Sequence, residues 1–578
     1  MAALFGTCGQ TIGSLDVFGA VHLRNNSFIR LQQPRVSRIS GGELRLFEAS
    51  IFETRNEDGD LFISNGALVG VRDTALFNNR GRTIVRNFSG VHNTQLNISG
   101  AGGFFNAEQL RIFNATMNVT GQGVFSNFGS SKVFRHGENG QPGSAGGIVN
   151  LGDLARFDVI DAQYVKSGGT LNIDGSSTFV NNSGGRFSQS GGDTNITGNG
   201  FFDNDGRIDL FGGSIDLSGS GVLATSSSYT QHGGTLNVQT GALFLNEAGA
   251  DRFLLNGGTF RVLAGGRATN NSVPIPNSPF GGFVNNDGSV IVDAAGILDG
   301  TGDYVQFAGA TTINGLMVQT GVTVRGGSVG GTGRIRRNVT NIAGSIGPGN
   351  SPGTLTTEGG FTQGPGGALA IEMDSLVAFN LLAIEGAAAL GGILNLTVDA
   401  GYATTAQEGD TLTIIRWESF SGAFSTVTGL SFGDGFVFTL DYGAAGLTLL
   451  VNAEQVAEVS EPGAIALFCI ALAGLGFARR RCVLSAHLAD GLEQSPIEQC
   501  IHRDDLGLAG IALTQKLGMR FGRLGRRLAR ILPQDASSCP EQLSLWDFVS
   551  AQSGGNGDET TRIIRRRAQY LRAGFPVD

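Results

Sequence analysis

The chain has 578 residues, of which 92 are glycine and 13 are proline, with 15% charged residues and a formal net charge of −9 at pH 7. The glycine content disfavours helix bundles, and the 40% of hydrophobic residues argues against a disordered linker. The negative net charge argues against a nucleic-acid-binding surface, so no nucleic-acid partner is expected. Short strands joined by tight turns fit this composition best, and we predict an all-β fold.

The N-terminal part gives strands but no export signal. Residues 1–10 (MAALFGTCGQ) lack a basic segment, and no apolar run of export length follows them. Because the C-terminal pattern described below requires export, we expect the natural start to lie upstream. Up to about residue 90, short strands such as 44–47 and 61–63 alternate with turns rich in glycine and asparagine.

A repeat with a period of about 22 residues follows. One longer step, from position 119 to position 173, predicts two units plus an insertion, for which Gly137–Gly143 is the candidate. A second strand, commonly with Phe followed by Asn, comes after each unit. The aligned segments are Gln95–Ile98, Thr116–Val119, Thr170–Ile173, Asp193–Ile196, Ser214–Leu217, Thr235–Val238 and, more loosely, Thr259–Val262.

A period of strand, turn, strand, turn is typical of a solenoid, and we predict a right-handed parallel β-helix over residues 1–330. In one unit, Leu171 and Ile173 should point inward, with Thr170 and Asn172 outward. Phenylalanines should stack inside, asparagines at turns should bond the backbone or the next Asn, and Gly-Gly pairs should supply positive φ at corners. The alternative is a tandem of antiparallel sandwiches, which needs turns roughly every 8–12 residues but no such register.

The sequence pattern changes near residue 330. Gly344–Leu355 resembles the Pro-Gly-Asn-Ser-Pro-Gly turn near the end of autotransporter-type β-helical passengers. This resemblance implies that residues 331–452 form a β-rich terminal section that caps the open end of the solenoid. The strands expected there are 368–373, 381–386, 391–398, 411–415, 420–425, 437–440 and 447–451.

A short acidic linker, residues 453–462, leads to an uncharged run, Gly463–Ala478, between a Glu-Pro dipeptide and three arginines. A helix over this run would be about 24 Å long, slightly short of a ~30 Å hydrocarbon core. Positive charge marks the cytoplasmic side, which leaves the N-terminal part outside the cytoplasm. The residues that define this pattern are Val459, Ser460, Glu461, Pro462, Arg479, Arg480 and Arg481.

This layout (459–481) resembles the PEP-CTERM sorting signal of Gram-negative envelope proteins, in which a Pro-Glu-Pro box precedes an apolar helix and a basic cluster. Ser460 stands where the family has its first proline, and a further segment (482–578) follows where the family signal normally ends the chain. The resemblance implies cleavage near the box by an exosortase, a membrane-embedded cysteine transpeptidase. Gly463–Ala478 would then be a transient inner-membrane anchor. The alternative is a buried core helix flanked by charge.

The tail, residues 482–578, is rich in Arg and Leu and lacks the repeat. Leu524–Leu532 and Thr561–Arg567 read as basic amphipathic helices, so the tail is expected to be partly helical or disordered. A membrane-surface or nucleic-acid role is one interpretation. We favour the other, a read-through beyond the natural stop behind the arginines.

Catalytic and metal-binding motifs are sparse. The five cysteines leave residues 9–468 without any, and neither they nor the six histidines have the spacing of a zinc site, a disulfide framework or a nucleophile and base pair. We therefore expect no metal, no cofactor and no catalytic residue. The residues concerned are Cys8, Cys469, Cys482, Cys500 and Cys539, and His22, His92, His136, His232, His487 and His502.

One sequence pattern is compatible with an enzyme. Four aspartates on neighbouring strands or turns could supply the carboxylate pair of a glycosidase, although solvated acids on a solenoid surface explain them more simply. They are Asp203, Asp205, Asp209 and Asp216. The function expected is therefore an exported surface or extracellular-matrix structural or adhesive protein, with extracellular polysaccharide as a partner. The alternative is a polysaccharide lyase or glycoside hydrolase.

Overall fold

A computed structural model describes residues 2–4, 9–12, 15–31, 37–54, 61–80, 82–86, 94–107, 110–113, 115–128, 133–136, 147–247, 253–272, 282–350, 352–433 and 435–454. These residues belong to one compact unit, residues 1–457. The whole sorting pattern 459–481, the tail 482–578 and the insertion candidate Gly137–Gly143 lie outside the described residues.

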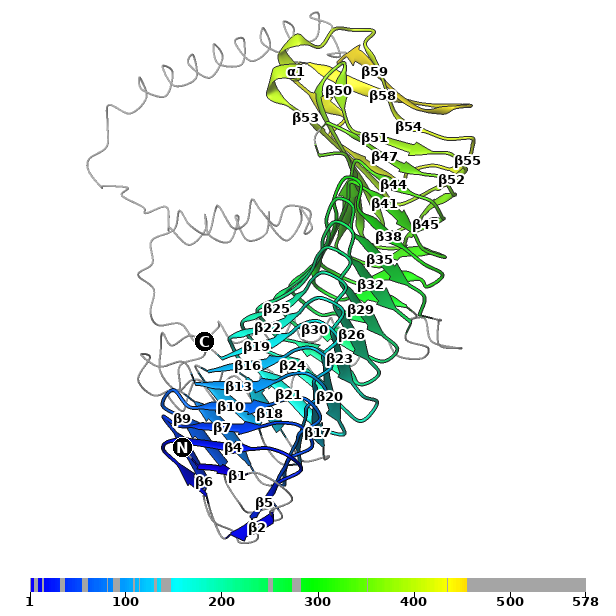
Figure 1. The fold of residues 1–578 in the computed structure, drawn as a ribbon. Coiled ribbons are helices and arrows are strands. Elements are labelled where there is room, and N and C mark those ends of the chain that lie inside the picture. Colours follow the sequence, from blue (N-terminus) through cyan, green and yellow to red (C-terminus); the bar gives the residue numbers. More distant parts are fainter. Residues whose placement is uncertain are drawn as a thin grey trace, which may run out of the picture. The chain divides into compact units, whose positions relative to one another are not determined.

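The described part is almost entirely β-structure arranged in three sheets, which we call A, B and C (Figure 1). Sheet A consists of β1 (Ala2–Leu4), β4 (Ala20–Leu23), β7 (Glu43–Leu46), β10 (Leu68–Val71), β13 (Gln95–Ile98), β16 (Thr116–Val119), β19 (Ile148–Leu151), β22 (Thr170–Ile173), β25 (Asp193–Ile196), β28 (Ser214–Leu217), β31 (Thr235–Val238), β34 (Thr259–Val262), β37 (Ser289–Val292), β40 (Ala310–Ile313), β43 (Ser328–Gly331), β46 (Ser345–Pro348), β49 (Ala368–Ser375), β50 (Ala378–Phe379), β53 (Ile393–Val398) and β56 (Thr426–Thr428).

Sheet B consists of β2 (Gly9–Ile12), β5 (Phe28–Leu31), β8 (Ile51–Thr54), β11 (Leu76–Asn79), β14 (Gly103–Asn106), β17 (Val124–Phe128), β20 (Arg156–Ile160), β23 (Thr178–Asn181), β26 (Phe201–Asn204), β29 (Val222–Thr225), β32 (Leu243–Asn246), β35 (Arg267–Asn270), β38 (Ile297–Asp299), β41 (Leu316–Val318), β44 (Arg334–Ile335), β47 (Thr354–Thr357), β51 (Leu381–Ile384), β54 (Thr411–Arg416), β57 (Ser431–Phe432), β58 (Phe436–Gly443) and β59 (Gly446–Ala453).

Sheet C consists of β3 (Asp16–Val17), β6 (Ser37–Ser40), β9 (Leu61–Ser64), β12 (Thr83–Arg86), β15 (Leu110–Phe113), β18 (Val133–His136), β21 (Gln163–Lys166), β24 (Arg186–Gln189), β27 (Arg207–Leu210), β30 (Tyr229–Gln231), β33 (Phe253–Leu255), β36 (Phe283–Asn285), β39 (Tyr304–Gln306), β42 (Val322–Val324), β45 (Val339–Asn341), β48 (Phe361–Gln363), β52 (Ala387–Leu390) and β55 (Ser419–Gly422).

The strand register confirms the parallel β-helix. Each solenoid strand pairs in parallel with the strand one coil earlier and one coil later, as β22 does with β19 and β25. All seven segments aligned in the sequence are sheet A strands, and β19 lies within the one long step of the repeat. The expected two strands per coil were wrong, because each coil contributes a third strand, in sheet C. In β24 this third strand carries Phe187 and follows the pair Gly184 and Gly185, so a glycine pair does not by itself mark a sheet A strand.

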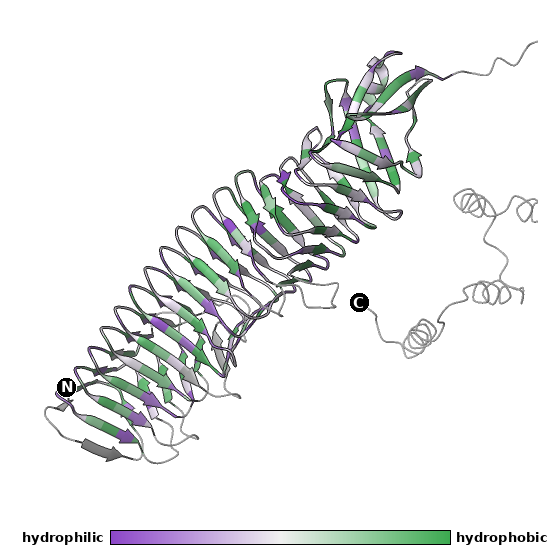
Figure 2. Cartoon of the chain, turned by 90° about the vertical axis from the view of Figure 1, so that its right-hand side faces the viewer, coloured by the Kyte–Doolittle hydropathy of each residue, from purple (hydrophilic) through white to green (hydrophobic). Residues whose placement is uncertain are grey.

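Buried and half-buried residues alternate along the strands as predicted, and Figure 2 shows hydrophobic and hydrophilic colouring mixed along the strands. Leu171 and Ile173 are buried, whereas Thr170 and Asn172 are half-buried on the outer surface. Phenylalanines of successive sheet B strands stack inside, with ring centroids 4.5 to 5.6 Å apart. Stacked aromatic rings stabilise beyond the area that they bury. The column consists of Phe52, Phe77, Phe104, Phe125, Phe157, Phe179 and Phe202.

The glycine pairs turn the corner from sheet C to sheet A. The second glycine of each pair has positive φ, for example +67° at Gly192 and +76° at Gly213. A Cβ on Gly192 would lie 2.1 Å from the carbonyl oxygen of Gly169, one coil earlier. Only glycine therefore fits where the coils approach each other here.

Beyond residue 331 the parallel coils continue without a break, because β43 pairs with β46 and β46 with β49. Gly344–Leu355 contains β46 and the start of β47. Antiparallel pairing dominates at the end: β59 pairs with β54 and β58, and a short helix, α1 (Ala400–Thr405), follows β53. Over the residues that the structure describes, no helix combines the length and apolarity needed to cross a bilayer.

Candidate functional site

A ladder of asparagines runs along the outer surface of sheet A. Each amide nitrogen donates to the amide oxygen of the asparagine one coil earlier, over 2.7 to 2.8 Å. Asp216 takes the next place, where it accepts from Asn237 at 2.7 Å. A carboxylate cannot donate, so the run of donors stops at Asp216 and begins again at Asn237. The members of the ladder before Asp216 are Asn97, Asn118, Asn150, Asn172 and Asn195.

A second set of asparagines is buried where sheet B turns toward sheet C. Asn181 donates to Asn204 over 2.6 Å, and Asn204 donates to Thr225 over 2.8 Å. These inner asparagines hold adjacent turns together, as the sequence predicted. The outer ladder is different, because its asparagines stand in the middle of strands and face solvent.

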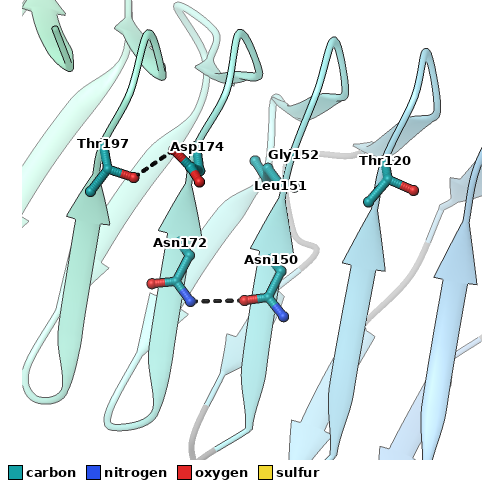
Figure 3. A pocket seen from close by; sticks show the side chains of 7 residues that line it. All are labelled: Thr120, Asn150, Leu151, Gly152, Asn172, Asp174 and Thr197. Carbon is teal, nitrogen blue, oxygen red and sulfur yellow. Dashed lines mark hydrogen bonds between the residues drawn. The ribbon is translucent and has the colours of Figure 1, made fainter. Parts of the chain in front are cut away.

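A shallow surface groove of about 420 Å³ lies beside the outer ladder (Figure 3). The carboxylate among its lining residues is Asp174, which accepts from Thr197 at 2.8 Å. The groove is polar along one edge and has no aromatic side chain among its lining residues. Those residues are Thr120, Asn150, Leu151, Gly152, Asn172, Asp174 and Thr197.

The four aspartates of the predicted carboxylate group are spread around the coil. Asp203 lies in sheet B and Asp205 in the turn after it, whereas Asp209 lies in sheet C and Asp216 in sheet A. The four therefore do not gather on one face. The alternative in which these four carboxylates gather is wrong, because nearby positions in a coil lie on different outer faces.

Asp203 instead has a carboxylate neighbour on its own face. Asp158 of β20 and Asp203 of β26 occupy the same column of sheet B, two coils apart, which is roughly 9.5 Å between Cα atoms. Asp158 pairs with Arg156 at 2.7 Å and accepts from Ser126 at 3.1 Å. Burial, with Asp205 adding to it, raises the pKa of Asp203 above its usual value, against the opposing charge of Arg156.

On sheet C, Asp209 forms the centre of a charged cluster. Its side chain is fully buried, and its two oxygens accept from Arg186 at 2.7 Å and from Arg207 at 2.7 and 2.9 Å. His232 lies 3.8 Å away, and its ring stacks on Phe211 with centroids 4.6 Å apart. We call these five residues the Asp209 cluster. The cluster was not predicted, although the spacing of Arg186 and Arg207 equals one repeat and signals neighbouring coils.

Lys166 of β21 is fully buried, and its ammonium donates to the carbonyl of Gly191 over 3.0 Å. Burial lowers the pKa of Lys166 from 10.5 to about 7, opposed by the charge of Asp193. Gln189 stands at the same place one coil later and donates to the carbonyls of Gly192 and Ser214. The position therefore fastens the corner where sheet C meets sheet A, and this explains Lys166 without a catalytic role.

Histidines and acids do not gather into a metal site in the part of the chain that the structure covers, where no group of three or more His, Cys, Asp or Glu side chains could hold an ion. His22 of β4 pairs with Glu43 at 3.4 Å, and burial together with Arg45 and Arg24 lowers the pKa of His22. The cysteines fall outside the described residues.

Neither a protein-family profile nor a curated protein matches the chain. Among solved structures, it is similar to a TibC-catalysed hyper-glycosylated TibA fragment, at 12% identity over 75% of this chain and 100% of the fragment. The TM-score of 0.13 is too low to carry an argument. The fold described above therefore rests on the strand register of this chain.

Proposed function

We propose that the protein is an exported structural or adhesive component of the cell surface or extracellular matrix, and that it contacts extracellular polysaccharide. The observation that carries the proposal is the outer asparagine ladder, which offers the same amide group on one coil after another. Four of the amides donate one N–H within the ladder, and each has a second N–H for a ligand; they are those of Asn118, Asn150, Asn172 and Asn195. Such a periodic row of donors suits a polymer with repeating hydroxyl groups better than a single small molecule.

The proposal includes anchoring and processing. The motif of Ser460, Glu461 and Pro462, the uncharged run 463–478 and the arginines 479–481 support recognition by an exosortase-type transpeptidase. Export would place the solenoid outside the cytoplasm, with Gly463–Ala478 as a transient inner-membrane anchor. This part of the proposal rests on the sequence alone.

Intact mass of the protein recovered from outside the cell tests both points. A C-terminus at or just before Glu461 supports sorting and makes 482–578 irrelevant to the mature product. A mass that still includes Arg479–Asp578 would overturn the sorting step, and recovery in the cytoplasm alone would overturn export. A Glu461→Ala variant should accumulate as the unprocessed form, whereas Glu454→Ala, in the linker upstream, should be processed normally.

A second candidate is a glycoside hydrolase on sheet B. It is favoured by Asp158 and Asp203, a carboxylate pair in which one member is paired with an arginine and the other has a raised pKa. The two Cα atoms are roughly 9.5 Å apart, and an inverting enzyme needs its two carboxyl groups roughly 6.5–9.5 Å apart. Release of reducing ends from polysaccharide by the wild type, abolished in Asp203→Asn and retained in a control variant of the exposed turn residue Asp287, Asp287→Asn, would favour this candidate over the structural role.

A further inference from the structure

We propose that the Asp209 cluster binds the carboxylate of an acidic sugar, so that the polysaccharide contacted by this protein is a uronate-containing one. This assignment deepens the adhesive role proposed above and rests on it. The charges on sheet C around the cluster do not balance. Across β21, β24, β27 and β30, the described sheet C strands around the cluster, Asp209 is the only carboxylate, and two exposed arginines share it.

Asp209 fixes the two guanidinium groups but does not occupy all of their N–H donors. Asp209 accepts from Nε of Arg186, and from Nε and one terminal nitrogen of Arg207. Within the described residues, the terminal nitrogens of Arg186 make no hydrogen bond, and its side chain is 40% exposed. A buried anion that fixes two arginines this way presents preoriented donors at the surface, in a geometry that suits a planar carboxylate.

The same outer face carries an aromatic surface. Arg207, Asp209 and Phe211 occupy alternate positions of one strand and its extension, so the arginine and the ring lie roughly 13 Å apart along the sheet. Phe211 is 46% exposed, and His232 covers one of its faces. On the preceding coil, the residue next to Phe211 is Ser190, whose side chain is too small to cover the other face of the ring.

The arginine pair and the ring of Phe211 together indicate the class of ligand. A sugar ring stacks its C–H groups on an aromatic face, and an acidic sugar adds a carboxylate that the arginines can take. The distance between Arg207 and Phe211 along the sheet matches a short chain of linked sugars rather than a single one. The structure therefore favours an acidic oligosaccharide over a lone inorganic anion, which would need the arginines but not Phe211.

The test is titration of the full chain with trigalacturonate by calorimetry at fixed ionic strength. Arg186→Gln should weaken binding roughly tenfold or more, since a charge-assisted hydrogen bond is lost. The carboxylate of Asp209 keeps Arg207, so this variant should fold. Phe211→Ala should weaken binding several-fold. Arg261→Gln is the matched control, because Arg261 has a similar exposure and pairs through Nε with Asp293 on the sheet A side.

Three results would overturn the assignment: no binding by the wild type, equal losses in Arg186→Gln and Arg261→Gln, or binding of sulfate or of neutral maltotriose that matches that of trigalacturonate. Localisation decides the proposed function separately. A cytoplasmic protein that binds trigalacturonate would defeat export and keep this site, and an exported protein that does not bind it would do the reverse.

Discussion

The side-chain amide of Asn172 donates to the amide oxygen of Asn150 over 2.8 Å, across one coil of the solenoid. The bond connects two strands that are already paired through their backbones, so it adds to the parallel register. It also fixes the orientation of both amides on the outer surface. The ladder is therefore both a stabilising element and the periodic surface on which the proposed function depends.

Removing one member of the ladder should have a modest cost. Asn172→Ala loses the donor to Asn150 and the acceptor for Asn195, and should lower the free energy of unfolding by about 1 to 2 kcal/mol. Thr312→Ala is the control, because Thr312 lies in the same outer column but makes no side-chain hydrogen bond among the described residues. Denaturant titration measures both, and equal effects would contradict a stabilising ladder.

The aromatic column should matter more than any surface feature. Phe179 is fully buried between Phe157 and Phe202, with centroids 5.0 and 4.7 Å away. Phe179→Ala should lower the free energy of unfolding by about 3 to 5 kcal/mol, because the cavity cannot collapse between fixed coils. Phe18→Ala, at a ring that is 72% exposed, should change it by less than about 0.5 kcal/mol. A small effect at Phe179 would argue against the stacked core.

Two glycine substitutions test the corner between sheets C and A, one at the corner and one as a control within a strand. Gly192→Ala forces a Cβ against the carbonyl of Gly169 at a φ of +67° and should destabilise by more than about 1 kcal/mol. A Cβ on Gly347 in β46 meets nothing within 4 Å. Gly347→Ala should therefore leave thermal stability unchanged or raise it slightly. The reverse order of melting temperatures would contradict the corner geometry.

Lys166 should make stability depend on pH. Its folded pKa, about 7, is below the unfolded value of 10.5, so its contribution is largest above pH 10.5 and is lost as pH falls to about 7. At about 1.4 kcal/mol per pH unit, this loss is at most on the order of 5 kcal/mol.

Lys166→Gln reproduces the residue used at Gln189 and should remove this dependence. The variant should exceed the wild type in stability at pH 7, and the difference should shrink toward pH 10. Comparing the two proteins at each pH cancels the other groups that titrate. A constant difference between pH 7 and pH 10 would show that Lys166 stays charged in the fold.

The repeat of apolar and polar residues determined the solenoid class, because only stacked coils bury an alternating strand whose partner recurs at a period of about 22 residues. The inward positions of Leu171 and Ile173 and the positive φ of the second corner glycines followed from the same pattern. The sorting motif is also a property of the sequence, and it stays a prediction.

Tertiary structure decided what shares a face. Sheet C and its arginine pair were not predicted, because the third strand of each coil was missed and a spacing of one repeat shows a shared face only once that strand is known. The four aspartates lie on different faces for the same reason. Each coil contains three strands, one in each sheet, so residues that are close in sequence face different sides. The sequence alone determined the solenoid class and the inward positions of the sheet A strands, because burial is periodic. Only the stacked coils placed Arg186 beside Arg207 and Asp209 beneath them.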